Sequence, residues 1–197
     1  MITHLPPAFY DIIQILIRGK QFQKKFINQF VKPRSGMKVL DVGCGTGWLF
    51  PLLPGCKYTG FDACPARIKA CRRRFKTNRA FLCKRLGRKM PFRRKSYDLA
   101  IAFGLLHHLD DSEAKYLVNH LRLALKAKGR LITVDGVFFK RQSKLKRMLL
   151  KLDRGRFVRT RPQYEEILAS KFKKVRTFIR NDIFRLPYDL LIAEATA

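Results

Sequence analysis

Residues 39–49 read VLDVGCGTGWL, and the expected architecture of the chain follows from this segment. An apolar run is interrupted by one acid, Asp41, and then leads into three glycines at alternate positions. The glycines are Gly43, Gly45 and Gly47. Glycine allows a tight turn and lets the backbone approach a ligand closely. We therefore expect a buried strand at Lys38–Val42, a ligand-binding turn and then a helix.

Two classes of nucleotide-like ligand compete for such a turn. A nicotinamide cofactor requires Gly-x-Gly-x-x-Gly, and Trp48 stands where the third glycine would be. Asp41 would also repel a pyrophosphate, whereas it suits a ligand that carries an ammonium group. S-adenosylmethionine has an amino acid tail, a sulfonium and no phosphate. The residues favour S-adenosylmethionine, although glycine turns also serve purely structural roles in many α/β folds.

Outside this segment, apolar runs of strand length alternate with helical patterns. We expect further strands at Lys57–Asp62, Ala80–Cys83, Tyr97–Phe103 and Gly129–Val134, and helices at Pro65–Phe75 and Asp111–Ala127. This alternation is typical of a mainly parallel sheet with helices on both faces. The last two runs, Val175–Ile179 and Tyr188–Ala193, are too close in sequence for a helical crossover, so they predict an antiparallel hairpin.

The length of 197 residues suits a single domain covering residues 1–197. Residues 1–35 are expected to contribute N-terminal helices, with two short amphipathic ones over residues 8–31. Residues 136–162 differ from the rest, because positions 140–161 carry ten Lys or Arg and one acid, Asp153. The spacing of Leu145 and Met148 still fits an amphipathic helix. We expect a basic helical insertion that forms part of a substrate lid.

The chain resembles the class I S-adenosylmethionine-dependent methyltransferases over nearly its whole length. Residues 39–49 are similar to the first motif of that family, and 97–100, 103–109 and 125–131 resemble segments around its fourth and fifth strands. The resemblance implies an α/β, Rossmann-like, doubly wound fold with a mainly parallel seven-stranded sheet and an antiparallel C-terminal strand. Residues 153–159 and 185–188 also resemble a narrower group of small, poorly characterised bacterial methyltransferases.

The resemblance also implies where S-adenosylmethionine would bind. Asp62 ends the expected second strand and matches the family's acid that hydrogen-bonds the ribose hydroxyls. A carboxylate can accept a hydrogen bond from each of the two hydroxyls. The implied cofactor-binding residues are Asp41, Gly43, Gly45, Gly47, Asp62, Ala63, Leu86 and Phe103. One position departs from the family, because Arg85 stands where many members carry an acid near the adenine amino group. A backbone amide near Leu86 could make that contact instead.

Two histidines, His107 and His108, follow the expected fourth strand at the rim where the methyl group would lie. Methyl transfer is an in-line displacement, so much of its acceleration can come from positioning, and a base is needed only when the acceptor keeps its proton. A neutral imidazole could take that proton, or it could simply pack the following helix. The residues expected to contact an anionic acceptor are Arg154, Arg159 and Tyr164, for which a structural or solvated role is the alternative.

The chain carries 43 Lys and Arg against 14 Asp and Glu, a formal charge of +29. Such a charge attracts nucleic acid, acidic lipid surfaces and phosphorylated substrates. Residues 66–95 alone hold 14 Lys or Arg and no acid, which makes an RNA-modifying enzyme a genuine alternative. Against it, Ala102–Leu105 stands where methyltransferases of base amines carry Asn-Pro-Pro-Tyr or Asp-Pro-Pro-Tyr.

The five cysteines form no Cys-x-x-Cys pair, which argues against a metal site and favours reduced thiols in a cytoplasmic protein. No apolar run approaches the length of about 20 residues needed to cross a bilayer. We expect an enzyme that uses S-adenosylmethionine to methylate a small molecule, which could be anionic, at oxygen or nitrogen. The alternatives are an RNA-modifying methyltransferase that uses the basic surface and a cofactor-binding module without turnover. The sequence leaves the oligomeric state open.

Overall fold

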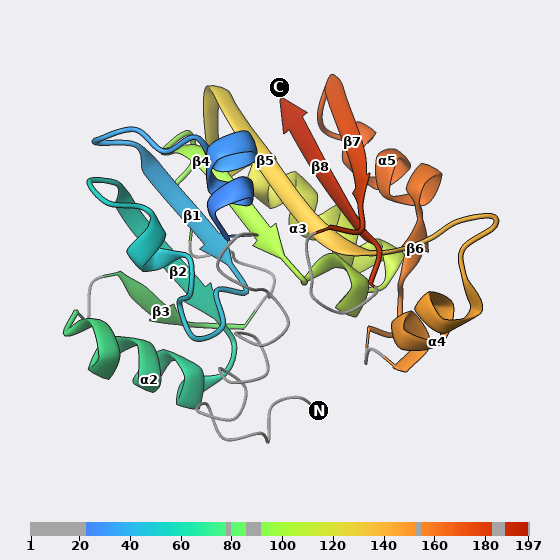
Figure 1. Cartoon of the computed structure of the whole chain (residues 1–197). Coiled ribbons are helices and arrows are strands. Elements are labelled where there is room, and N and C mark those ends of the chain that lie inside the picture. The colour runs from blue at the N-terminus through green and yellow to red at the C-terminus, as the bar shows by residue number, and fades with distance from the viewer. Residues whose placement is uncertain (1–22, 78–79, 86–91, 153–154, 183–187, 197) are drawn as a thin grey trace.

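The structure is a computed structural model that describes residues 23–77, 80–85, 92–152, 155–182 and 188–196. The strands are β1 (Lys38–Val42), β2 (Lys57–Asp62), β3 (Phe81–Cys83), β4 (Tyr97–Phe103), β5 (Leu125–Phe138), β6 (Arg159–Thr160), β7 (Lys174–Arg180) and β8 (Leu190–Thr196). The helices are η2 (Ile27–Val31), η3 (Phe50–Leu52), α2 (Pro65–Phe75), η4 (Leu106–His108), α3 (Asp111–Ala124), α4 (Lys144–Leu152) and α5 (Arg161–Ala169). Figure 1 shows a single twisted sheet with helices packed against it.

The strands lie in the order β3-β2-β1-β4-β5-β8-β7, and the short β6 pairs with β5 outside this path. β1 to β5 are parallel, whereas β8 runs antiparallel to both β5 and β7. The predicted mainly parallel sheet, its antiparallel C-terminal strand and the final hairpin are therefore confirmed, and β6 is an addition to the seven expected strands. The carboxyl ends of the parallel strands meet at one edge of the sheet.

Each face of the sheet carries its own hydrophobic core, because successive residues of a strand point to opposite sides. On one face, Val39 and Ile101 pack with Ile68 of α2 and with Phe26 in the helical segment 23–31. The other face is built differently. There, residues of the same strands pack against α3 and α5, the buried members being Leu40, Ala100, Leu131, Leu117, Val118, Leu121, Tyr164, Ile167 and Leu168. This arrangement is the doubly wound layering that the alternating pattern predicts.

The segment after the glycine turn corrects one expectation. The sequence predicted a helix there, but residues 45–49 form consecutive turns that lead into the short 3-10 helix η3. Their amides bond three residues back, as in the bonds from Phe50 N to Gly47 O at 3.1 Å and from Leu53 N to Phe50 O at 3.2 Å. Pro51 has no amide hydrogen to donate, and Pro54 disfavours a helical conformation at the residue before it. The two prolines explain why no α-helix forms.

The boundary between α3 and β5 also differs from the expected one. The helix ends at Ala124, and Leu125 already pairs with Tyr97 of β4, so the strand begins four residues before Gly129. The strand then continues to Phe138, so the first residues of the expected insertion 136–162 belong to the sheet. α4 is the helix expected within that insertion, and the insertion ends in β6 and the start of α5.

The N-terminal helices are only partly covered by the structure. Residues 23–26 are helical and continue into the π-helical turn η2, with Phe26, Ile27 and Phe30 buried against the sheet. Arg130 of β5 donates to the carbonyl oxygens of Phe30 and Val31, which fixes the end of this helix on the sheet. The earlier part of the expected helices lies outside the described residues.

Candidate active site

The glycine turn at the carboxyl end of β1 has a backbone that only glycine adopts easily. The φ angles of Gly43, Gly45 and Gly47 are 75°, 57° and 75°, all in the left-handed region. A Cβ added to Gly47 would lie 2.9 Å from Cε1 of Phe81 and 3.0 Å from Cε2 of Phe75. The turn therefore requires glycine for its conformation and, at Gly47, also for space.

Asp62 at the end of β2 connects this turn to the start of α2. Its Oδ2 accepts a hydrogen bond from Gly45 N at 2.9 Å, and its Oδ1 accepts one from Cys64 N at 2.8 Å. Arg67 of α2 adds an ion pair, with Nη1 3.8 Å from Oδ2. Each carboxylate oxygen has two lone pairs, so the carboxylate retains acceptor capacity for hydroxyl groups of a ligand. The adjacent residue, Ala63, is exposed at the same rim.

Asp41 lies deeper, inside the sheet, and is 1% exposed. Its Oδ2 accepts a hydrogen bond of 2.6 Å from the hydroxyl of Tyr58 on β2. Burial and the neighbouring Asp41 carboxylate raise the pKa of Tyr58 well above its usual value, so the tyrosine stays a donor. The pair gives Asp41 a fixed position behind the glycine turn.

An aromatic cluster borders the glycine turn at the end of β4. The ring of Phe103 lies 5.2 Å from that of Trp48 and 5.6 Å from that of Phe26, both in edge-to-face geometry. Trp48, which stands where a nicotinamide-binding motif would have its third glycine, thus contributes to an apolar wall beside the turn. Leu105 also borders the turn, because its Cδ1 lies 3.4 Å from the position that a Cβ on Gly43 would occupy. Leu86 is outside the described residues.

The histidine His107, in η4, forms a buried pair with Asp135 of β5. The His107 Nδ1 lies 2.8 Å from Asp135 Oδ1, and the backbone amide of His107 donates to the same oxygen at 3.2 Å. The two residues are 5% and 1% exposed. A carboxylate partner at Nδ1 favours the tautomer with its hydrogen on that nitrogen, which gives Nε2 the lone pair. His108 is exposed, and the centroid of its ring lies 4.2 Å from that of His107, with the two ring planes tilted by 50°.

Sequence reasoning missed Asp135, although a signal exists. It is the one acid in the otherwise apolar run 131–137 of β5. Asp135 Oδ2 is buried and has no hydrogen-bond partner among the described residues. A buried acceptor of this kind is costly unless a donor, such as a water molecule or a ligand group, reaches it.

The basic insertion returns over this pair. The amide of Phe157 donates to the carbonyl oxygen of His107 at 2.9 Å, and a Cβ on Gly155 would overlap the imidazole ring of His107. The main chain at residues 155–157 thus lies directly on the histidine. Only glycine permits this approach.

Arg159 and Tyr164, both expected to contact an acceptor, are buried and make hydrogen bonds within the protein. Arg159 is 5% exposed and donates to the carbonyl oxygens of Leu106 at 2.9 Å and Leu109 at 2.7 Å, and to Asp111. Tyr164 is 1% exposed and donates to the carbonyl oxygen of Gly136 at 3.0 Å, while burial raises its pKa. Arg159 therefore stabilises the turn that carries His107. Arg154 lies outside the described residues.

Among the described residues there is no group of three or more His, Cys, Asp or Glu arranged to hold a metal ion. Within the same part of the chain, no helix has the length and apolar composition that a membrane span requires.

Comparisons with known proteins agree on the fold and on the type of domain. A family model described as a methyltransferase domain matches residues 39–129. A malonyl-[acyl-carrier protein] O-methyltransferase of Acetivibrio thermocellus is 34% identical over 55% of this chain and 41% of its own length. A tRNA (carboxymethyluridine(34)-5-O)-methyltransferase of Arabidopsis thaliana is 33% identical over 51% of this chain and 24% of its own length.

Among solved structures, a protein of Pyrococcus horikoshii superposes with a TM-score of 0.66 at 17% identity, covering 96% of this chain and 99% of that one. This superposition supports the fold across nearly all of the chain. The chain spans less than half the length of the curated relatives named above.

Proposed function

Since the chain belongs to the class I S-adenosylmethionine-dependent methyltransferases, we propose that it methylates a small-molecule acceptor at an oxygen or nitrogen that carries a proton. When bound, S-adenosylmethionine supplies a methyl group on a sulfonium. The residues present fit this cofactor. The three glycines of the turn have left-handed φ angles, the Asp62 carboxylate accepts from the amide of Gly45, and Phe103 with Trp48 forms an apolar wall beside the turn.

The observation that carries the proposal is the pair formed by His107 and Asp135. Asp135 orients the imidazole and stabilises the positive charge that develops when Nε2 takes a proton. With S-adenosylmethionine bound, the acceptor would receive the methyl group, and the acceptor's proton would pass to Nε2 of His107. The positive charge of the sulfonium would then be carried by the imidazolium of His107 beside the Asp135 carboxylate, so charge balances.

Two observations support a small acceptor. The main chain at residues 155–157 lies on His107, which restricts the approach of a bulky substrate to the imidazole. The segment after β4 also has none of the proline-containing sequence that serves base amines. RNA is the second candidate, favoured by the charge of +29 and by relatives whose printed names refer to tRNA.

The cofactor site is tested by calorimetric titration with S-adenosylmethionine and, separately, with NADH. We expect the wild-type protein to bind S-adenosylmethionine alone. Asp62→Asn should weaken this binding at least tenfold, since one charge-assisted hydrogen bond is worth about 1.5–3 kcal/mol. Asp98→Asn is the matched control, because Asp98 accepts from Lys38 N and Lys126 Nζ at the amino end of β4, far from the turn. Undiminished affinity in Asp62→Asn would refute the assignment of the site.

A further inference from the structure

Helix α4 is attached to the sheet by one narrow face. Leu150 is fully buried, and its Cδ2 lies 2.7 Å from the position that a Cβ on Gly136 would occupy. Four residues earlier, Lys146 forms an ion pair of 2.8 Å with the buried carboxylate of Asp189. Residues four apart share a helix face, so Lys146 and Leu150 define the side of α4 that contacts the protein.

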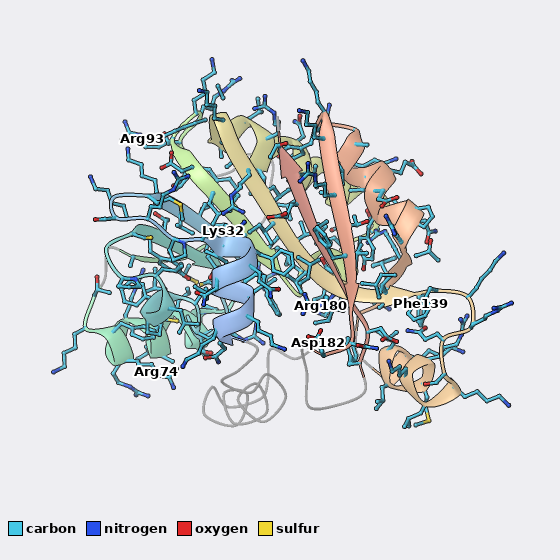
Figure 2. The ribbon with its side chains drawn as sticks, turned by 45° about the horizontal axis from the view of Figure 1, so that its top comes forward. Lys32, Arg74, Arg93, Phe139, Arg180 and Asp182 are labelled. Atoms are coloured by element: carbon cyan, nitrogen blue, oxygen red, sulfur yellow. The ribbon has the colours of Figure 1, made fainter. Side chains whose placement is uncertain are left out.

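A second face of α4 is apolar and open to solvent. Leu145 and Met148 are three residues apart and are 53% and 50% exposed. These are the largest exposures among the large hydrophobic side chains of the described residues. Single exposed apolar residues are ordinary, but two on one helix face within a strongly charged segment are not. Figure 2 shows α4 at the margin of the molecule, with side chains directed away from the sheet.

The third face of α4 is purely cationic. Lys144, Arg147 and Lys151 follow one another at helical spacing and are all exposed. Residues 140–152 contain six Lys or Arg and no acid. The helix thus combines an exposed aliphatic stripe with a flanking row of positive charge and a third side fixed to the domain.

We propose that α4 docks the protein on an anionic lipid bilayer. Leu145 and Met148 insert among the upper acyl chains, and Lys144, Arg147 and Lys151 contact the lipid phosphates, as in helices that lie in the membrane interface. Charge complementarity alone would suit RNA equally well. The aliphatic stripe decides between them, because Leu and Met side chains gain nothing from a phosphate backbone but gain from leaving water.

Docking in this way brings the candidate active site to the membrane surface. α4 packs on Gly136, and the next residue in the chain on the amino side is Asp135, the partner of His107. Both lie toward the carboxyl end of β5, the edge of the sheet that carries the glycine turn. The acceptor would therefore meet the enzyme close to the bilayer.

The test is flotation of the purified, nuclease-treated full chain with phosphatidylcholine vesicles made with or without phosphatidylglycerol. We expect binding only to the anionic vesicles. Leu145→Ser with Met148→Ser should lower the partition coefficient at least about tenfold, as should Lys144→Gln, Arg147→Gln and Lys151→Gln together. Two matched controls should stay within about twofold of wild type. The first is Leu123→Ser with Ile179→Ser, which removes exposed apolar residues elsewhere, and the second is Lys69→Gln, Arg73→Gln and Lys84→Gln, which removes equal charge.

Calorimetric binding of S-adenosylmethionine should be the same in all variants, which shows that each is folded and separates this test from that of the cofactor site. Absence of wild-type protein from the floated anionic vesicles would overturn the proposal. Vesicle binding by the Leu145→Ser, Met148→Ser variant equal to that of wild type would also overturn it. So would a loss in the second control as large as that of the Lys144→Gln, Arg147→Gln, Lys151→Gln variant, because either result means general electrostatic adsorption. If the wild-type protein did not float with anionic vesicles, and the Lys144→Gln, Arg147→Gln, Lys151→Gln variant alone lost affinity for total tRNA, the partner of α4 would be nucleic acid.

Discussion

At the scale of single residues, the Asp135 carboxylate should control how well His107 accepts a proton. Asp135→Asn keeps an oxygen near Nδ1 but removes the charge that stabilises the imidazolium. We expect the turnover number to fall about 100-fold or more, with KM and the affinity for S-adenosylmethionine little changed. Nitrogen-15 NMR of labelled histidine gives a readout independent of activity, since the wild-type signal of His107 should report hydrogen on Nδ1. His108→Gln assigns the signals. A variant with unaltered turnover and tautomer would contradict the role of Asp135.

Gly47 offers a second test at this scale, because Gly36 is a natural control. Both glycines have a φ of 75°, but a Cβ on Gly47 would meet the rings of Phe81 and Phe75, whereas a Cβ on Gly36 would meet nothing within 4 Å. Gly36→Ala should cost about 1 kcal/mol of unfolding free energy from backbone strain alone. Gly47→Ala should cost about 2–4 kcal/mol, because overpacking adds to the strain. Urea unfolding measures both, and equal losses would show that space at Gly47 is not limiting.

At the scale of elements, the contact between α5 and β7 should depend on pH. Glu165 accepts hydrogen bonds from the hydroxyl of Thr177 at 2.5 Å and from Arg161 Nε at 2.8 Å. Both bonds lower the pKa of Glu165, and the bond from Thr177 has the larger effect. A carboxyl group whose pKa is lower in the folded than in the unfolded protein stabilises the fold above its unfolded pKa, and this stabilisation disappears as the pH falls through the folded value. Glu165→Gln should therefore lower the melting temperature at neutral pH and converge with wild type in acid.

Glu166→Gln is the neighbouring control, since Glu166 is exposed and its carboxylate forms a solvated ion pair of 3.2 Å with Lys115. It should leave the melting temperature nearly unchanged at both pH values. A Glu165→Gln curve parallel to that of wild type would exclude the linkage.

Elements also show how far sequence reasoning reached. The bounds of β1, β2, β4 and α2 agree with prediction, because apolar runs and punctuating residues such as Pro65 are local signals. The prediction of a helix after the glycine turn was wrong, and the reason is also local, because Pro51 and Pro54 prevent the helix. Asp135 and His107 are 28 residues apart, and their contact depends on how β4 and β5 align. Arg159 reaches Leu106 across 53 positions, which no spacing pattern reveals.

At the scale of the whole molecule, the charge of +29 should produce salt-dependent binding to RNA without chemistry on it. Each phosphate contact releases counterions, so we expect the affinity for total tRNA to fall at least about 100-fold between about 50 and 200 mM salt. Filter binding measures this change. Tritiated S-adenosylmethionine gives the decisive control. Incorporation of the label into RNA would show that RNA, and not a small molecule, is the methyl acceptor. Binding that is insensitive to salt would also contradict the electrostatic account.

The backbone of Gly155 on the ring of His107 has a further consequence for timing. Side chains that cover a site can rotate away within nanoseconds, but an acceptor that approaches this face of the ring would have to displace main chain that is also held by the amide of Phe157. Displacement of a loop takes microseconds to milliseconds, and the loop moves against the viscosity of the solvent. The turnover number would then be limited by solvent viscosity. Raising the viscosity with sucrose should slow turnover while the activation barrier of methyl transfer stays the same.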